Sequence, residues 1–212
     1  MSDLSPEQIA SREKTLIAAL LLSMWAPLAT GIAVVLSQST TQLADFIRRS
    51  VELVALFISW RVFRVVEKGE ETTVKKKARL ERIAGFSVAI AMGISGATMF
   101  IVTITRFSTF EPGGNVYPGL AIATLGFFTN SWFWRRYTRM TRENFNIVIN
   151  SQRLLYRAKA MVDLVVIISL SAVLIDPTAS ITPYMDSLGS IAVAFYLLWS
   201  GFNNLKTTLN KA

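Results

Sequence analysis

Two apolar stretches of this sequence, residues 43–66 and 154–175, contain ionisable side chains at intervals of four residues. Arg48 and Glu52 would lie on one face of a helix, as would Lys159 and Asp163, because residues four apart are neighbours on a helix surface. A charge at the middle of a membrane costs about 2.5–3.5 kcal/mol on insertion scales and usually faces a partner or a water-filled cavity. The candidate transport-site residues are Arg48, Glu52, Lys159, Asp163, Asp45 and Arg49.

The two sets of charges are predicted to reach a similar depth. At about 1.5 Å per residue, Glu52 lies roughly 13 Å above Arg61, and Asp163 lies roughly 9 Å above Arg157. Two interpretations are open, because each set sums to zero charge. The side chains line a water-accessible substrate pathway, or they form a buried ion-pair network that only fixes helix packing.

The acidic residues nearest the predicted helix ends have simpler explanations. Asp45 is also four residues from Arg49, but it lies within about a turn of the outer end, where it could cap the helix or meet water. Asp186, at the start of the last apolar stretch, is expected to mark a helix entry rather than a binding site.

The composition is that of a membrane protein. Of 212 residues, 52% are hydrophobic and 17% are charged, the mean hydropathy is +0.43, and the charges are concentrated between long apolar runs. The chain has no histidine and no cysteine, so the commonest transition-metal ligand and the usual neutral-pH proton shuttle are absent. No glycine-rich phosphate loop and no pairing of a nucleophile with a base is visible. We therefore expect no enzyme activity, no catalytic residue, no cofactor and no bound metal.

The apolar runs predict an all-α membrane protein, a bundle of six transmembrane helices. A span needs roughly 20 mainly apolar residues to cross a hydrocarbon core about 30 Å thick. The six predicted spans are Thr15 to Leu36, Leu43 to Val66, Ile83 to Thr105, Pro118 to Trp134, Leu154 to Ile175 and Met185 to Leu205. The tryptophans lie mostly near predicted ends of spans and are interpreted as interface anchors; they are Trp25, Trp60, Trp132, Trp134 and Trp199.

Basic residues predict the orientation of the bundle. The connections after the second and fourth spans are rich in Lys and Arg, whereas the other three connections carry one basic residue between them. Because positive charge is retained in the cytoplasm, both termini are expected there. The same rule explains the net charge of +8, so we expect no nucleic acid partner. We expect an integral protein of a bacterial inner (plasma) membrane, with the lipid bilayer as its main partner.

Two further patterns in the third span and before it have open interpretations. Small residues recur every fourth position, at Gly85, Ala89, Gly93 and Ala97, which permits close helix approach inside the bundle or at a dimer interface. The run from Lys75 to Lys77 is an orientation signal or a contact for anionic lipid headgroups.

Several short motifs resemble those of the cation diffusion facilitators. They are Leu43-Ala44-Asp45 running into Glu52-Leu53-Val54-Ala55-Leu56, Arg79-Leu80-Glu81 before span three, and Asp186-Ser187-Leu188 opening span six. The resemblance implies a six-span fold that exports zinc or similar divalent metals in exchange for protons, typically as a homodimer.

The resemblance also shows where this sequence departs from that family. Its central metal is held by a His or Asp followed four residues later by an Asp, and the matching positions here are Arg48 with Glu52 and Lys159 with Asp163. A guanidinium or ammonium group has no lone pair for a metal, so we expect no tetrahedral zinc site there. The cytoplasmic metal-binding domain of the family would follow span six, where only a short polar tail is seen. We therefore expect a single transmembrane domain over 1–212, with a cytoplasmic N-terminal segment 1–14 and no C-terminal cytoplasmic domain, and a dimer held by membrane helices.

Two functions follow from these patterns. The first is a cation diffusion facilitator-like transporter of the cation efflux type with an altered small ion or solute as substrate, which includes an anionic or zwitterionic one. Proton coupling would fall to Lys159, because a buried lysine can lose its proton whereas arginine stays charged. The alternative is a non-transporting membrane scaffold or partner subunit stabilised by the intramembrane ion-pair network.

Overall fold

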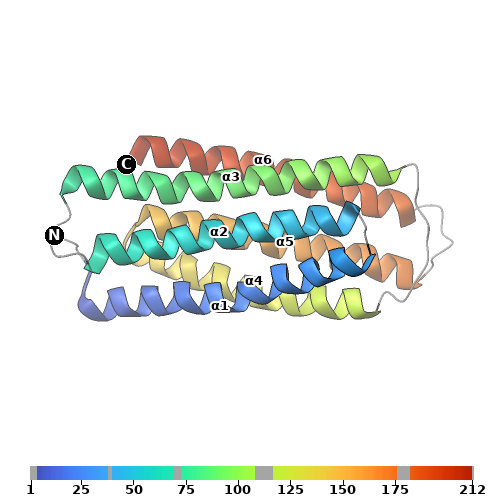
Figure 1. The fold of residues 1–212 in the computed structure, drawn as a ribbon, viewed down its shortest axis with the longest axis horizontal. Helices are drawn as coiled ribbons and strands as arrows, with labels where there is room; N and C mark the ends of the chain where they lie inside the picture. Colours follow the sequence, from blue (N-terminus) through green and yellow to red (C-terminus); the bar gives the residue numbers. More distant parts are fainter. Residues whose placement is uncertain (1–3, 38–39, 69–72, 108–116, 176–181, 212) are drawn as a thin grey trace.

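The chain is an up-and-down bundle of long helices (Figure 1). The structure, a computed structural model, describes residues 4–37, 40–68, 73–107, 117–175 and 182–211, and within them it contains six α-helices and no strand. The helices are α1 (Pro6–Ser37), α2 (Thr40–Lys68), α3 (Val74–Phe107), α4 (Tyr117–Glu143), α5 (Ile147–Ile175) and α6 (Thr182–Lys211). Each predicted span lies inside one of these helices, so the predicted fold class is confirmed. The helices extend beyond the spans at most ends.

The most extensive helix packing is between α3 and α6, between α4 and α5, and between α1 and α2. In Figure 1, α3 and α6 lie along one side, α1 and α4 lie along the opposite side, and α2 and α5 lie between them. The inner helix α2 packs against α1, α3 and α5, and α5 packs against α4, α6, α3 and α2. Helix α1 begins and α6 ends toward the end of the bundle where α2 is followed by α3 and α4 by α5 (Figure 1). We call this the basic end.

Two described stretches are apolar and long enough to cross a membrane by length and composition alone. They are Pro6–Ile32 and Val74–Thr105, which lie in α1 and α3. This statement applies to the described residues only, and several side chains near the helix ends opposite the basic end are not among them.

The start of α1 shows how local sequence fixes a helix end. The backbone N–H of Gln8 donates to Ser5 Oγ at 3.3 Å, and the backbone N–H of Ser5 donates to Gln8 Oε1 at 3.0 Å. This reciprocal pair is a capping box, which supplies partners for backbone groups that the first turn leaves free. Pro6 follows Ser5 at the first helical position, where its missing N–H costs nothing.

Glycines let α3 and α6 approach closely. A Cβ on Gly85 would overlap the side chain of Thr208, and a Cβ on Gly201 would lie 3.1 Å from the Ala89 carbonyl oxygen. Close backbone approach of this kind supplies dispersion contacts, which lipid does not replace with a hydrophobic driving force. The first half of the predicted small-residue stripe therefore packs inside the bundle.

The second half of that stripe faces away from these contacts. Among the described residues, no heavy atom of another helix lies within 4 Å of a Cβ built on Gly93, and Ala97 is exposed. The helix face that meets α6 continues instead through Gly96, where a Cβ would lie 3.0 Å from the Ala194 carbonyl oxygen. A strict four-residue repeat drifts around an α-helix of 3.6 residues per turn, which explains the change of face.

Candidate functional site

Four helices enclose a polar cavity that contains most of the candidate residues. Its volume is about 260 Å³, and α1, α2, α4 and α5 each contribute to its wall. The charged lining residues are Arg48, Arg49, Glu52, Lys159 and Asp163, and the polar ones are Ser23, Thr129, Asn130 and Tyr156. The charges of spans two and five, for which the sequence predicted a similar depth, thus line the same cavity.

Glu52 accepts contacts from three helices. Its side chain is 4% exposed, and its Oε1 atom lies 3.5 Å from Arg48 Nη1 on the same helix. The Ser95 hydroxyl of α3 donates to Oε1 at 3.1 Å, and Lys159 Nζ of α5 lies 3.2 Å from Oε2. A buried carboxylate needs partners of this kind, because an isolated charge in a low-dielectric interior is very costly.

Asp163 lies on the side of the cavity formed by α4. The amide nitrogen of Asn130 donates to Asp163 Oδ2 at 2.7 Å, a short charge-assisted hydrogen bond. A Cβ on Gly126 would lie 3.0 Å from the same oxygen, so the carboxylate rests against a helix surface that lacks a side chain. These two α4 residues fix where the carboxylate lies.

Lys159 joins two helices instead of pairing along its own. In the described part of the chain its ion-pair partner is Glu52, and Asp163, four residues along α5, bonds to α4 instead. The ammonium nitrogen also lies 5.0 Å from the centre of the Tyr156 ring, within the range of a cation–π contact. The Tyr156 hydroxyl in turn lies 3.2 Å from the Ser23 hydroxyl of α1.

For the two remaining candidate residues, Arg49 and Asp45, the structure gives fewer contacts. Arg49 lines the cavity together with Arg48. Asp45 belongs to α2, but its side chain lies outside the described set, and the side chain of Asp186 at the start of α6 does so too.

The described lining does not suit a tetrahedral transition metal. Among the described residues, no group of three or more carboxylates could hold a metal ion, and the chain has neither histidine nor cysteine. Arg48 and Lys159 contact the Glu52 carboxylate in this cavity, and neither cation has a lone pair to give to a metal. A metal at this place would have to displace Lys159 from Glu52.

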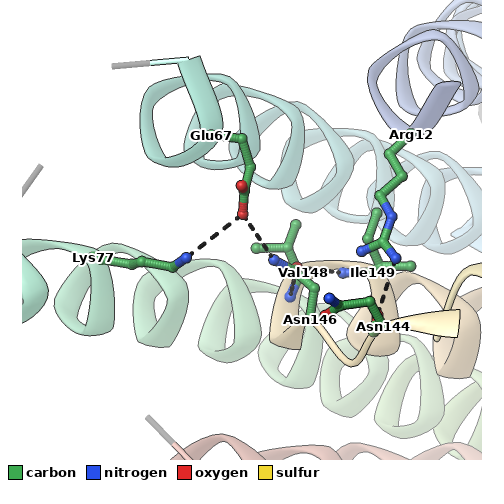
Figure 2. A network of polar contacts seen from close by, with 7 residues as sticks. All are labelled: Arg12, Glu67, Lys77, Asn144, Asn146, Val148 and Ile149. Carbon is green, nitrogen blue, oxygen red and sulfur yellow. Dashed lines mark hydrogen bonds and ion pairs between the residues drawn. The ribbon is translucent and has the colours of Figure 1, made fainter. Parts of the chain in front are cut away.

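A second polar cluster, which the sequence did not reveal, lies at the basic end (Figure 2). Arg12 of α1 is 1% exposed, and its Nη2 atom donates to the carbonyl oxygens of Met140 at 2.9 Å and Asn144 at 3.0 Å. These carbonyls belong to the last turn of α4 and the residue after it, where a helix leaves acceptors unpaired. Arg12 therefore binds the end of α4 to α1.

Glu67 performs a similar task between other helices (Figure 2). Its Oε1 atom lies 3.7 Å from Lys77 Nζ of α3 and accepts a hydrogen bond from Asn146 Nδ2 at 3.4 Å. Asn146 also caps α5, because its Oδ1 accepts from the backbone N–H groups of Val148 at 3.0 Å and Ile149 at 3.2 Å. The only signal in the sequence was the asparagine directly before an apolar run.

Six long helices, four of which line the polar cavity, form this all-α bundle. Residues 16–211 match the family described as cation efflux transmembrane domain, so the chain belongs to the cation efflux family. A comparison with curated protein sequences found no match. Family membership makes the chain a membrane protein with a cation-transporter-like role and an ion as its substrate.

Proposed function

We propose that this chain is a secondary transporter of the cation efflux type whose substrate site contains built-in cations. The site consists of Arg48, Arg49, Glu52, Lys159 and Asp163, and Asp45 earlier on α2 is a further candidate. The observation that carries the proposal is the contact between Lys159 Nζ and Glu52 Oε2 at 3.2 Å inside the cavity. A transported ion would exchange with this internal contact.

The cavity chemistry also supports an altered substrate. Three cations and two carboxylates line the described wall, which suits a cation only when Lys159 has lost its proton or moved away from Glu52. Lysine can give up its proton and arginine cannot, so proton coupling through Lys159 is part of the proposal. The proposal does not include zinc bound in the usual tetrahedral way.

Flux measurements test the transporter proposal. The chain is reconstituted in proteoliposomes, and uptake of zinc, manganese, magnesium and protons is followed for the parent chain, Glu52→Gln and Asp163→Asn. We expect flux of at least one ion, reduced at least about ten-fold in both variants, because a charge-assisted contact contributes about 1.5–3 kcal/mol. Equal flux in all three proteins would exclude this site.

A binding measurement tests the role of the internal ammonium group. Purified parent chain and Lys159→Asp are titrated with zinc, manganese and magnesium. Binding that appears only in Lys159→Asp would support a metal site that the lysine disables. Metal binding of equal strength in both proteins would contradict that role of Lys159.

A non-transporting scaffold or partner subunit is the second candidate. The observation in its favour is that Glu52 contacts Arg48, Lys159 and Ser95, while Asp163 bonds to Asn130, so the charges already have protein partners. Under this function, neutralising Arg48 and Glu52 together is tolerated better than neutralising either alone. Absence of such coupling in a detergent unfolding measurement would count against it.

The proposal includes the membrane orientation and a dimer. Both termini are placed in the cytoplasm of a bacterial cell, on the strength of the Lys- and Arg-rich basic end. A homodimer would use the open α3 face around Gly93 and Ala97. Since the chain has no cysteine, a single Ala97→Cys variant tests this contact by cross-linking in membranes. Failure to cross-link there would exclude this face.

A further inference from the structure

A groove on the outer surface of α4 gathers arginines at the basic end. Its volume is about 550 Å³, and its lining is Trp134, Arg135, Thr138, Arg139, Arg142 and Glu143. The three arginines are spaced by four and three residues and therefore lie on one face of the helix. All three are exposed, so the face is open to whatever surrounds the protein.

Arginines of α5 extend the same positive surface. The Arg157 guanidinium carbon lies 5.9 Å from the centre of the Trp134 ring, which places Arg157 beside the groove. Arg153 precedes the predicted fifth span, and burial, followed by repulsion from Arg157 and Arg142, lowers its pKa from the usual value. The arginines of α4 and α5 are thus close enough to repel one another.

Protein carboxylates do not neutralise this surface. The ion pairs of the described residues involve Arg48, Arg64, Lys77 and Lys159 as cations. Neither the three groove arginines nor Arg153 and Arg157 of α5 form one with a described carboxylate. Glu143 lines the groove but is exposed. The positive charge is therefore left for a partner outside the chain.

The choice of basic residue differs between the two basic connections. Residues 135–157 contain six arginines and no lysine, whereas residues 68–82 contain four lysines and two arginines. A simple orientation signal needs only positive charge, and either residue supplies it. Arginine adds a planar fork that binds phosphate oxygens two at a time, which lysine does not.

The groove also lies at a suitable depth for lipid. It begins at Trp134, where the predicted fourth span ends, and aromatic rings of this kind sit at the level of the headgroups. Arg157 contacts a second ring, with its guanidinium carbon 5.7 Å from the centre of Tyr196. The guanidinium groups are therefore held at the boundary between hydrocarbon and water.

We propose that this α4 groove, with Arg157 of α5 beside it, binds the phosphate headgroup of an anionic phospholipid in the leaflet that faces the basic end. Arg135, Arg139 and Arg142 hold the phosphate oxygens, and Trp134 borders the acyl chains. The binding site is separate from the charged cavity, and it does not depend on what the cavity transports.

Lipid titration of the full chain tests the proposal. The purified protein in detergent is titrated with short-chain phosphatidylglycerol, phosphatidylcholine or inorganic phosphate, and bound species are counted by native mass spectrometry. The test variant is Arg135→Gln/Arg139→Gln/Arg142→Gln. The matched control is Lys75→Gln/Lys76→Gln/Arg79→Gln, which removes the same charge from exposed positions at the same end of the bundle.

The proposal predicts that phosphatidylglycerol binds best and that the arginine variant loses affinity roughly 100-fold, at about five-fold per basic residue. The α3 control should lose much less. An equal loss of phosphatidylglycerol affinity in both variants would show that only general surface charge matters and would overturn the proposed lipid site. Inorganic phosphate binding as tightly as phosphatidylglycerol would overturn the assignment to lipid.

A second variant separates phosphate geometry from charge. Arg135→Lys/Arg139→Lys/Arg142→Lys keeps the charge and the exposed positions but removes the forked donors. We expect weaker phosphatidylglycerol binding than in the parent chain and stronger binding than in the glutamine variant. Affinity equal to that of the parent chain would contradict recognition by paired guanidinium donors.

Discussion

Lys159 Nζ of α5 and Glu52 Oε2 of α2 lie 3.2 Å apart and join the two inner helices of the bundle. The side chains of both residues are largely buried, at 13% and 5% exposure, so water screens the contact little. Removing Glu52 should therefore leave the buried Lys159 without this ion-pair partner, and removing Lys159 should leave Glu52 with Arg48 and Ser95 as its described partners.

We expect Lys159→Met and Glu52→Gln to be coupled. Each single change should lower the free energy of unfolding by about 3 kcal/mol, and the double change should cost clearly less than the sum, because it leaves neither charge unpaired. Reversible unfolding in detergent measures this, with the exposed Lys206→Met as the control. Additive effects would show that the contact contributes nothing of its own.

Gly126 is predicted to be essential to the position of Asp163. In Gly126→Ala the new methyl group would lie 3.0 Å from Asp163 Oδ2, so the carboxylate must shift by a few tenths of an ångström and its short hydrogen bond with Asn130 must adjust. We expect ion flux to fall at least about ten-fold while the helix content stays the same, since a charge-assisted hydrogen bond contributes about 1.5–3 kcal/mol.

The matched control for Gly126→Ala is Gly93→Ala. No atom of another part of the bundle lies within 4 Å of the added methyl group at Gly93, so flux should be unchanged. The stability of this control should stay equal or rise by up to about 1 kcal/mol, because alanine favours a helix. If Gly93→Ala lowered ion flux as much as Gly126→Ala, the loss in Gly126→Ala could not be attributed to displacement of Asp163.

Substitutions at Gly85 and Thr208 should compensate each other in part. Gly85→Ala places a methyl group against Thr208, and we expect a loss of about 1–3 kcal/mol in unfolding free energy from overpacking. Adding Thr208→Ala should restore part of that loss, because it removes the atoms nearest the new methyl group. Thermal unfolding of both variants measures the effect, and no recovery in the double variant would be evidence against direct contact.

Asn146 is predicted to stabilise the start of α5. Asn146→Ala removes the acceptor for two backbone N–H groups and the donor to Glu67 Oε1, so we expect a loss of about 1–2 kcal/mol. The exposed Asn210→Ala near the end of α6 is the control and should change stability by less than about 0.5 kcal/mol. Equal melting temperatures for the two variants would contradict the capping role.

The sequence predicted the helices better than the partners of their side chains. Long apolar runs determined six spans, because the bilayer requires a minimum length of apolar helix. The spacing of Arg48 and Glu52 correctly predicted a pair on one helix, and both lie in the cavity. Spacing alone suggested the same for Lys159 and Asp163, but Asn130 and Gly126 of α4 hold the carboxylate elsewhere.

Contacts between distant segments were beyond the reach of sequence patterns. Arg12 lies before the first predicted span and resembles any other charge in a connection, yet it is 1% exposed. Its acceptors are backbone carbonyls, which no side-chain motif marks. The same holds for Ser95, a small hydroxyl residue in an apolar helix that donates to Glu52.

The contacts of Arg12 and Glu67 also constrain the order in which the chain can assemble. The acceptors of Arg12 lie 128 and 132 residues later in the sequence, and the asparagine that donates to Glu67 lies 79 residues later. During synthesis from the N-terminus, α1 is therefore complete long before Arg12 gains its acceptors, whereas Glu67 can already meet Lys77 once the start of α3 is made and gains Asn146 only later. The contacts of Arg12 at the basic end are therefore complete only when the segment that joins α4 to α5 has been made.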